Sequence, residues 1–436
     1  MKRSIIAAFY TLLVLLVVSC KPSINTPTPS SGTADFSKYI AVGNSLTAGF
    51  ADGGLYLEGQ KVAFPNLLAE QMKGAGGGAF TSPFFDEAHL NGSGYLKLTG
   101  INNGSPVLEE VNDKLAYRNQ AGNLIKYTEP IQNLGVPGMR LDLAFIAPFG
   151  ALNNYFERLL LDAEVGSKSY FNYAINHDHT FFTFWLGNND VLGFATAGGV
   201  VTGPTSQLTD KSTFASLYTA FINELTAKGQ NGVIATIPDV TAIPFFTTVT
   251  IDALLAGAKA AAPDMASQIN AIFIQDKTAT VPGFPAGVRQ ATNEDLVVLN
   301  FPTEKLGQPN PEGVFYGLHP ANPMEDQYIL DKAEVARVKD YVSSYNETIR
   351  NIAEEKGLAL ADVYSYLNQV KSSIIVNGAE INSTFITGGA FSLDGIHLTP
   401  KGNALIANLF IREINKTFNA KLSNIDVNKY RGVKFP

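Results

Sequence analysis

Compact apolar runs recur along this chain and are separated by longer amphipathic segments. Within each run nearly every position is apolar, without the alternation expected of a strand that faces water on one side. Such runs predict strands that are buried on both faces. Four of them lie at residues 39–42, 181–186, 233–237 and 358–363. They are typical of the interior strands of a parallel sheet.

Helical periodicity fills the intervals between these runs. Residues 212–228 place apolar side chains three or four positions apart, and Gly229 follows as a C-terminal stop. Residues 332–356 repeat this pattern and end at Gly357, and residues 404–418 predict a final helix. Because strands and helices alternate, the sequence predicts an α/β fold in which right-handed crossovers join parallel strands.

Two stretches do not fit a minimal domain of this kind. Residues 74–130 contain polar turns and short apolar runs, and residues 241–331 contain a possible helix at 251–261 and a proline-rich loop at 302–323. Both stretches leave the sheet and return to it, so we interpret them as insertions within one domain spanning residues 36–436. In open α/β sheets, loops at the carboxyl ends of the strands surround the ligand crevice. The insertions are therefore expected to determine substrate choice.

The first nineteen residues have the layout of a secretory signal peptide. Lys2 and Arg3 precede an apolar run at 5–18, which is shorter than the ~20 residues of a membrane-spanning helix. A membrane anchor helix is the less favoured alternative. Cys20 closes the run and is the only cysteine, which excludes an internal disulfide and a cysteine-ligated metal cluster. Residues 20–35, rich in Pro, Ser and Thr, predict a flexible tether.

The segment Val17-Val18-Ser19-Cys20 resembles the lipobox of bacterial lipoproteins. This resemblance implies cleavage before Cys20 and lipidation of that cysteine. Several acyl chains on one residue would hold the protein at a membrane surface without a spanning helix. The expected location is therefore the bacterial cell envelope, on either the outer-membrane or the periplasmic face.

The charge balance argues against a nucleic-acid partner. Loss of Lys2 and Arg3 with the leader leaves 30 basic residues (32 minus 2) against 39 acidic ones, a balance of −9. Such a surface lacks the basic footprint that nucleic acid or anionic lipid requires. Charged residues make up 16% of the chain and hydrophobic residues 45%, as in a well-packed globular body.

Two glycine-containing segments carry the first candidates for acyl-transfer chemistry. Residues 43–46 place Ser45 in a turn just past a predicted strand, where a base could activate its hydroxyl as a nucleophile. Residues 133–138 follow a strand-like segment and contain Gly135 and Gly138. A glycine N–H can approach a developing oxyanion closely because no side chain intrudes.

Two further segments carry polar side chains. Residues 187–190 follow the most aromatic predicted strand, and the amide of Asn189 could donate to an oxyanion or could cap the helix that follows. Asp394 and His397 stand three positions apart in a loop. In that arrangement the carboxylate can hold the tautomer of the imidazole while the other ring nitrogen faces Ser45.

In this combination and order, the four segments resemble the blocks of the SGNH, or GDSL, family of lipases and acylhydrolases. The resemblance implies a three-layer α/β/α, flavodoxin-like fold with a mostly parallel sheet. It also implies a catalytic triad in which Ser45 is the nucleophile, His397 the base and Asp394 the group that orients the base.

The same resemblance implies an oxyanion hole formed by Ser45, Gly138 and Asn189, and leaves Asp190 to cap the following helix. It selects Gly138 over Gly135 because the family's glycine stands five residues after an asparagine. One departure is Asn44, which stands where the family usually has aspartate. That acid is not a triad member, so the exchange leaves proton transfer intact and leaves the close subfamily open.

The remaining histidines carry less weight. His177 and His179 alternate as two metal ligands on one face of a strand could, but no third ligand is evident nearby, so a loop at the start of the strand is favoured. His89 and His319 lie in the insertions and are expected to be solvated. No metal and no cofactor is expected, since no metal-binding or phosphate-binding motif occurs.

Together these observations predict a carboxylic ester hydrolase that works through an acyl-enzyme on Ser45. An apolar acyl group or a lipid is favoured by aromatic residues in or near the expected crevice loops, namely Phe64, Phe84, Phe85, Phe245 and Phe246. The alternatives are a carbohydrate O-deacetylase of the same fold and a non-catalytic lipoprotein that binds a glycan or a protein.

Overall fold

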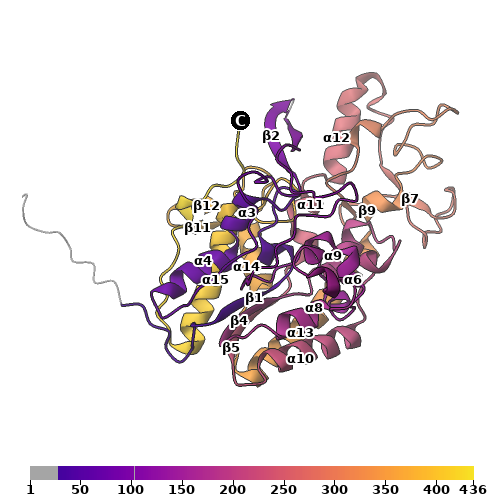
Figure 1. The fold of residues 1–436 in the computed structure, drawn as a ribbon. Helices are drawn as coiled ribbons and strands as arrows, with labels where there is room; N and C mark the ends of the chain where they lie inside the picture. The colour runs from indigo at the N-terminus through magenta and orange to yellow at the C-terminus, as the bar shows by residue number, and fades with distance from the viewer. Residues whose placement is uncertain (1–27, 103) are drawn as a thin grey trace, which may run out of the picture.

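The computed structural model describes residues 28–102 and 104–436 and is built around a parallel sheet (Figure 1). Four strands pair in the order β1-β4-β5-β10. They are β1 (Tyr39–Gly43), β4 (Phe181–Trp185), β5 (Asn231–Ala235) and β10 (Ala359–Ala361). The predicted α/β fold is therefore confirmed, although β5 begins at residue 231 rather than 233 and β10 is shorter than its apolar run.

A further stretch of chain extends the sheet beyond β1. Asn133 forms a parallel bridge with Ala41, whose N–H donates to the carbonyl of Gln132 (2.9 Å) and whose carbonyl accepts from the N–H of Leu134 (2.8 Å). The carboxyl ends of this stretch, of β1 and of β4 consequently lie next to one another. Three of the four candidate segments begin at this edge, which is where ligands bind in open α/β sheets.

Helices cover both faces of the sheet and complete three layers (Figure 1). On one face, α4 (Phe64–Lys73) packs against α15 (Pro400–Phe418), and α15 contacts β10 and β5. On the other face, α10 (Lys211–Leu225) packs against α13 (Lys332–Lys356), which contacts the same two strands.

The ends of these helices follow from local side-chain chemistry. α13 has the predicted bounds because Asp331 and Glu334 form a reciprocal capping box at its start and Gly357 (φ 63°) ends it. α15 begins at residue 400 rather than 404, since the Thr399 hydroxyl accepts from the N–H of Gly402 (3.0 Å). α10 ends at residue 225, three positions before its predicted end at 228.

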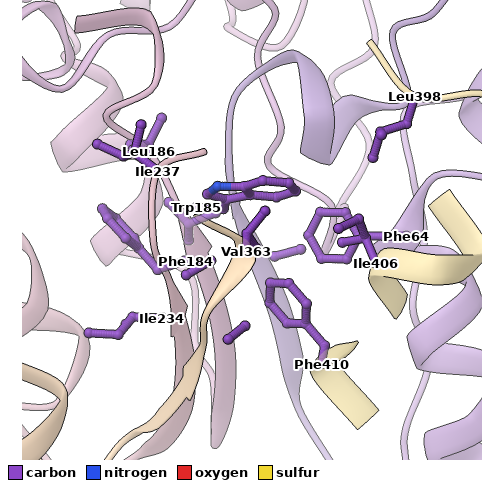
Figure 2. Close-up of a cluster of buried hydrophobic side chains, with 14 of the residues drawn as sticks. Phe64, Phe184, Trp185, Leu186, Ile234, Ile237, Val363, Leu398, Ile406 and Phe410 are labelled. Atoms are coloured by element: carbon purple, nitrogen blue, oxygen red, sulfur yellow. The ribbon is translucent and has the colours of Figure 1, made fainter. Parts of the chain in front are cut away.

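The core between the sheet and the α4–α15 layer is built around Trp185, the last residue of β4 (Figure 2). Phe64 and Phe410 pack edge-on or tilted around it, with ring centroids 5.7 Å and 6.3 Å from the indole. All three side chains are almost completely buried. Burying an aromatic side chain of this size stabilises the fold by about 1.5–3 kcal/mol.

The shorter elements lie in the connections. The remaining helices are α2 (Ser45–Ala48), α3 (Leu57–Lys61), α5 (Leu141–Ala144), α6 (Phe149–Leu152), α7 (Asn154–Glu157), α8 (Tyr170–Ile175), α9 (Asn189–Thr196), α11 (Pro244–Thr247), α12 (Ile251–Ala261) and α14 (Val363–Lys371). The remaining strands form antiparallel pairs: β2 (Tyr95–Asn102) with β3 (Ser105–Val111), β6 (Phe273–Gln275) with β7 (Val288–Gln290), β8 (Leu296–Val297) with β9 (Ile329–Leu330), and β11 (Ile374–Val376) with β12 (Ala379–Ile381). The predicted helix at 251–261 is confirmed as α12.

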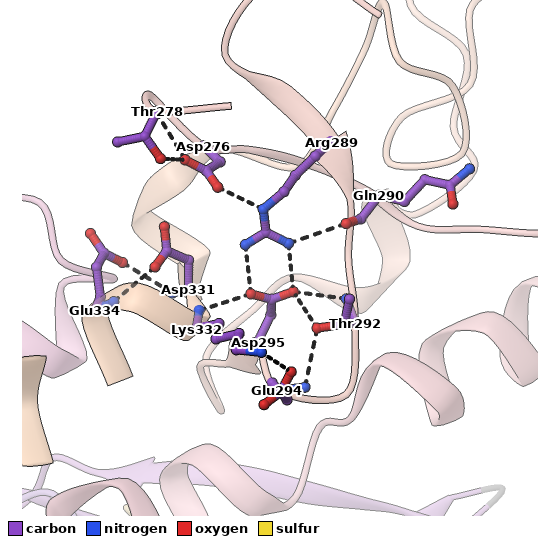
Figure 3. A network of polar contacts seen from close by, with 10 residues as sticks. All are labelled: Asp276, Thr278, Arg289, Gln290, Thr292, Glu294, Asp295, Asp331, Lys332 and Glu334. Carbon is purple, nitrogen blue, oxygen red and sulfur yellow. Dashed lines mark hydrogen bonds and ion pairs between the residues drawn. The ribbon is translucent and has the colours of Figure 1, made fainter. Parts of the chain in front are cut away.

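Residues 241–331 lie beside the main body in Figure 1, with α12 and β7 at their outer end. A polar network supports this stretch (Figure 3). The Arg289 guanidinium donates to Asp276 (2.6 Å) and to both carboxylate oxygens of Asp295 (2.7 and 2.8 Å). Asp295 also accepts from the backbone N–H of Lys332 (2.9 Å), the first residue of α13. Charge-assisted bonds of this kind therefore fasten the stretch to the body.

The predicted leader and Cys20 lie outside the described residues, as does most of the predicted tether. The part of the tether that the structure describes packs on the body. Thr33 donates from its N–H to the carbonyl of Phe418 (2.8 Å), Ser30 accepts from Lys421, and the side chain of Ala34 is buried. The ordered body thus begins before residue 36, earlier than predicted. Among the described residues, no helix combines the length and apolar character needed to cross a bilayer.

Candidate active site

The turn after β1 presents Ser45 at the carboxyl edge of the sheet. Asn44 caps the short helix α2, and its side-chain oxygen accepts from the N–H of Leu46 (3.2 Å). Ser45 is therefore the first residue of a helix, directly after a buried strand. Gly43 is required before it, because a Cβ at that position would lie 2.0 Å from the Thr47 hydroxyl oxygen.

Ser45, His397 and Asp394 form one line of hydrogen bonds. Ser45 Oγ lies 2.9 Å from His397 Nε2, and His397 Nδ1 lies 2.8 Å from Asp394 Oδ2. With the carboxylate accepting from Nδ1–H, Nε2 carries the lone pair that faces the serine hydroxyl. The expected juxtaposition of an alcohol, an imidazole and a carboxylate is thus present across a separation of 352 residues.

Backbone donors surround the Asp394 carboxylate. Oδ1 accepts from the N–H groups of Ile396 (2.9 Å) and His397 (2.8 Å), and Oδ2 accepts from the N–H of Gly53 (2.9 Å). Burial by itself would raise the pKa of this carboxyl, but the adjacent His397 and these hydrogen bonds outweigh it and hold the pKa well below its usual range. Asp394 is consequently ionised wherever His397 can act as a base.

Three possible oxyanion donors lie next to Ser45. The N–H groups of Ser45 and Gly138 donate to no acceptor within the described residues. Gly138 has φ +76°, and the Asn153 side chain holds its turn by donating to the carbonyl of Pro137 (2.9 Å). Asn189 Nδ2 donates one of its two hydrogens to the carbonyl of Met139 (2.9 Å), which leaves the second hydrogen available to an oxyanion. These donors come from three separate connections at one edge of the sheet: the start of α2, the turn at Gly138 and the start of α9.

The geometry separates the two glycines of the second segment. Gly135 donates its N–H to Asn133 Oδ1 (3.0 Å), and a Cβ there would lie 2.4 Å from the backbone nitrogen of Ala48. That glycine serves the packing of two chain segments. Gly138, in contrast, lines the cleft that contains Ser45, His397 and Asn189.

The cleft has a volume of about 460 Å³. Its other walls are mainly apolar, with two asparagines, and comprise Phe50, Pro137, Leu152, Asn153, Asn154, Tyr155 and Leu192. Phe50 packs against the His397 ring at 4.7 Å between centroids and against Tyr155 at 6.0 Å. Leu152 is 79% exposed at the rim.

Comparison with known proteins assigns the chain to a family. The family model described as GDSL-like Lipase/Acylhydrolase matches residues 39–410. The chain belongs to the GDSL-like lipase/acylhydrolase family. That assignment confirms the resemblance inferred from the four segments, and it makes esters the substrates to be expected of the family. A search of curated proteins found no match.

Three solved structures show a weak overall similarity to this GDSL-like chain. One is a variant of an acetyl-xylooligosaccharide esterase from Geobacillus Stearmophilus, with 11% identity, 88% of this chain and 96% of that chain covered, and a TM-score of 0.36. Another is an alpha/beta hydrolase enzyme from the metagenome of Lake Arreo, Spain (13%, 88% and 96%, 0.35). The third is a lipase/acylhydrolase from Enterococcus faecalis (12%, 89% and 99%, 0.32).

The predicted capping role of Asp190 is wrong. Asn188 occupies the N-cap position of α9, without a side-chain cap bond. Asp190 is completely buried, and its carboxylate accepts from the N–H of Leu141 (2.8 Å) and from the hydroxyl of Thr209 (2.7 Å). The short-range capping rule failed because the partners of this carboxylate come from distant parts of the chain.

The phenylalanines expected near the crevice do not line the cleft. Phe64 belongs to the core around Trp185, and Phe85, Phe245 and Phe246 are also almost completely buried. Aromatic composition could not distinguish core positions from cleft positions. The apolar cleft walls come instead from the turn after Ser45 and from short helices between residues 149 and 196.

Asp52 is a site-supporting residue that the sequence analysis missed. Its carboxylate accepts from the N–H of Leu393 (2.9 Å) and from the hydroxyl of Tyr56 (2.7 Å), and its own N–H donates to Ser392 Oγ (2.9 Å). Burial raises the pKa of this carboxyl. The only local signal in the sequence was Asp52 followed by Gly53 and Gly54, a pattern typical of a tight turn. In the structure Asp52 has a left-handed backbone (φ 54°).

The remaining histidines make backbone contacts. His177 Nδ1 lies 2.8 Å from the carbonyl of Tyr173, and the two ring nitrogens of His179 lie 2.8 and 2.9 Å from the carbonyls of His177 and Leu225. Both residues precede β4 in a loop, as predicted. Within the described residues, no group of three or more acidic, histidine or cysteine side chains is arranged to hold a metal ion.

Proposed function

We propose that this member of the GDSL-like family is a serine ester hydrolase that works through an acyl-enzyme on Ser45. The observation that carries the proposal is the continuous hydrogen-bonded line from Ser45 through His397 to Asp394. The proposal assigns the catalytic triad to these three residues. It assigns the oxyanion hole to the N–H groups of Ser45 and Gly138 and to the Asn189 amide.

In the first half-reaction, Ser45 Oγ attacks the acyl carbon and His397 Nε2 takes the hydroxyl proton. The carbonyl oxygen becomes an oxyanion and accepts from the three donors, each worth about 10²–10³ in turnover. As the tetrahedral intermediate collapses, His397 gives its proton to the leaving alcohol. In the second half-reaction, water loses a proton to Nε2 and attacks the acyl carbon, and the proton returns to Ser45 Oγ as the acid leaves.

The composition of the cleft favours an uncharged, apolar acyl group. Apart from His397, no residue that lines the cleft can carry a charge near neutral pH. Leu152 and Leu192 offer aliphatic surface beside the nucleophile, and the exposed Leu152 would be covered by a bound alkyl chain. Covering such a side chain contributes about 1.5–3 kcal/mol.

A panel of aryl esters from acetyl to long-chain acyl tests the proposal. We expect hydrolysis by the protein beginning at residue 28 and its loss in Ser45→Ala, with a fluorophosphonate probe labelling the former and not the latter. Ser216→Ala, at an exposed position of α10, is the matched control and should behave as the parent protein. Leu152→Ala should lower kcat/KM by about 10-fold for long acyl chains and little for acetyl.

The same experiment separates the alternatives. Activity confined to acetyl esters, and stronger on acetylated oligosaccharides, would replace the proposal by a carbohydrate O-deacetylase. Absence of both hydrolysis and labelling would favour a non-catalytic binding protein.

We further propose that the protein is anchored in the bacterial cell envelope through lipid on Cys20. The proposal is supported by the sequence of the first twenty residues alone. Incorporation of a labelled fatty acid into the expressed full chain, lost in Cys20→Ser, is the expected result. A full chain that takes up no label and stays in the aqueous phase would oppose it.

A further inference from the structure

Arg140 is an almost completely buried arginine beneath the proposed oxyanion hole. Its side chain is 1% exposed, and it stands two residues after Gly138. A buried guanidinium is unfavourable unless each of its N–H groups finds an acceptor. The hydrogen-bond partners of Arg140 therefore indicate what this buried residue does.

Every arm of the guanidinium is engaged. Nε and Nη2 donate to the two oxygens of Asp142 (both 2.8 Å), and Nη2 also donates to the hydroxyl of Thr209 (2.8 Å). Nη1 donates to the backbone carbonyl of Asn189 (3.0 Å) and to that of Gln207 (2.9 Å). Only a planar fork with five donors satisfies such a set.

These bonds join the two loops that carry the proposed donors. Gly138 and Arg140 belong to the loop before α5, and Asn189 is the first residue of α9, at the end of the loop that follows β4. Three more contacts cross between these two segments. Asn189 Nδ2 donates to the carbonyl of Met139 (2.9 Å), and the Asp190 carboxylate accepts from the N–H groups of Leu141 (2.8 Å) and Asp142 (3.3 Å). Of the contacts between the loops, that of Arg140 is the one made by a charged donor.

We propose that Arg140 is the positioning residue of the oxyanion hole: its bond to the Asn189 carbonyl fixes the separation between the Gly138 N–H and the Asn189 amide. The inference rests on the proposed esterase function, since it assigns a task to the oxyanion donors. Arg140 itself lines no part of the cleft.

The expected effect follows from the geometry that such donors need. A donor stabilises the oxyanion when it lies about 2.7–3.1 Å from the oxygen, and a displacement of about 1 Å lowers the rate by about 10²-fold. The loss should fall on kcat, because the ground-state carbonyl carries less charge than the oxyanion.

Arg140→Lys in the purified protein is the primary test. Lysine keeps the positive charge but cannot bind Asp142 with two parallel bonds while also reaching the Asn189 carbonyl. We expect kcat on an aryl ester to fall by about 10–100-fold, with KM changed by less than about threefold.

Arg289→Lys is the matched control. Arg289 also forms a bidentate pair with one aspartate and a third bond with another, but all of these partners lie in residues 276–295, and none lines the cleft (Figure 3). It should lower Tm and leave kcat and KM unchanged. A general effect of losing a buried arginine would appear in both variants.

A double variant tests the route of the effect. If Arg140 acts through Asn189, then Arg140→Lys in an Asn189→Ala background should lower kcat by less than about threefold further. Should Arg140→Lys fail to fold, Asp142→Asn replaces it, because an amide breaks the bidentate pair that orients the guanidinium toward the Asn189 carbonyl and leaves the arginine in place.

The outcomes are distinct. Active wild-type protein, inactive Ser45→Ala, and an Arg140→Lys or Asp142→Asn variant with unchanged kcat would overturn the positioning role and leave the esterase function standing. A loss that multiplies fully with that of Asn189→Ala would also overturn it. Wild-type protein that neither hydrolyses esters nor labels would remove the proposed function and this inference together.

Discussion

Replacing Asp394 by asparagine changes one atom of the proposed triad and little of its shape. The carboxylate oxygen Oδ1 accepts from two backbone N–H groups, those of Ile396 and His397, and from the hydroxyl of Ser392 (3.1 Å). In the Asp394→Asn side chain, the amide oxygen is therefore expected to occupy the position of Oδ1, where it can accept from the same donors. The new NH₂ group then stands where Oδ2 was and faces Gly53 N–H and His397 Nδ1.

The consequence is a change of tautomer. Two donors cannot face each other, so His397 carries its proton on Nε2 and accepts with Nδ1 from the new amide. Nε2 then donates to Ser45 Oγ and has no lone pair with which to take the serine proton. The equivalent exchange in a serine protease lowers kcat by about 10⁴, which corresponds to about 5 kcal/mol of barrier. Gly53 N–H also loses its acceptor, but because Gly53 is exposed, water can replace that bond at little cost in stability.

The assay compares kcat of Asp394→Asn with that of Asp52→Asn on the best aryl ester of the panel. Asp52 is a buried carboxylate that holds the same loop through Leu393 but makes no hydrogen bond with His397. Its amide can keep both partners, because the Tyr56 hydroxyl can accept as well as donate, and kcat should stay within about threefold. Burial raises the pKa of Asp52 and the pKa of Asp394 is lowered, so a neutral side chain suits only the former. An Asp394→Asn protein with more than a tenth of wild-type kcat would refute the tautomer argument.

Two further predictions concern charge. Asn44→Asp should leave kcat within about threefold. Asn188 accepts from Asn44 Nδ2 in the structure (2.8 Å), and its side-chain amide can rotate to donate to the new carboxylate instead. The double variant Asn44→Asp with Asn188→Asp buries two facing carboxylates, and its free energy of unfolding, measured by chemical denaturation, should fall by about 3–5 kcal/mol. Burial raises the pKa of Glu334 to about 7, so the folded state binds the proton of this carboxyl more tightly than the unfolded state does. The contribution of Glu334 to the free energy of unfolding therefore declines as pH rises from 4.5 toward 7. Glu334→Gln keeps the capping box. Its free energy of unfolding, from thermal melts at both pH values, should match that of the wild type at pH 4 and exceed it by about 1–3 kcal/mol at pH 8.

The elements that the sequence predicted well are those specified by their own residues. The central strands are buried on both faces, so continuous apolar runs mark them. Helix α13 carries its capping box and its terminal glycine within the chain segment itself, and both of its ends were predicted correctly. The four chemical segments were found for the same reason, because each is a short local pattern.

The parts that the sequence could not predict depend on distant partners. Asp52 acts on Ser392 and Leu393, which are 340 and 341 positions away, and no pattern near residue 52 specifies those contacts. Arg140 and Asp190 have the same character, since their partners lie in other loops. The prediction of the cleft walls was wrong for a different reason. Hydrophobicity identifies a phenylalanine as apolar but does not indicate whether it lies in the core or lines the cleft.

The sheet order explains why the base needs support of its own. Ser45, Gly138 and Asn189 follow chain segments that are neighbours at one edge region of the sheet, so the strand pairing itself brings them together. The loop with Asp394 and His397 instead comes more than 30 residues after β10, which lies at the opposite edge of the sheet from β1. That loop is positioned by the turn at Asp52 and Gly53, which directly follows the helix of Ser45. The base is therefore fastened to the nucleophile's own turn, so that a movement of this turn carries alcohol, imidazole and carboxylate together and preserves the distances between them.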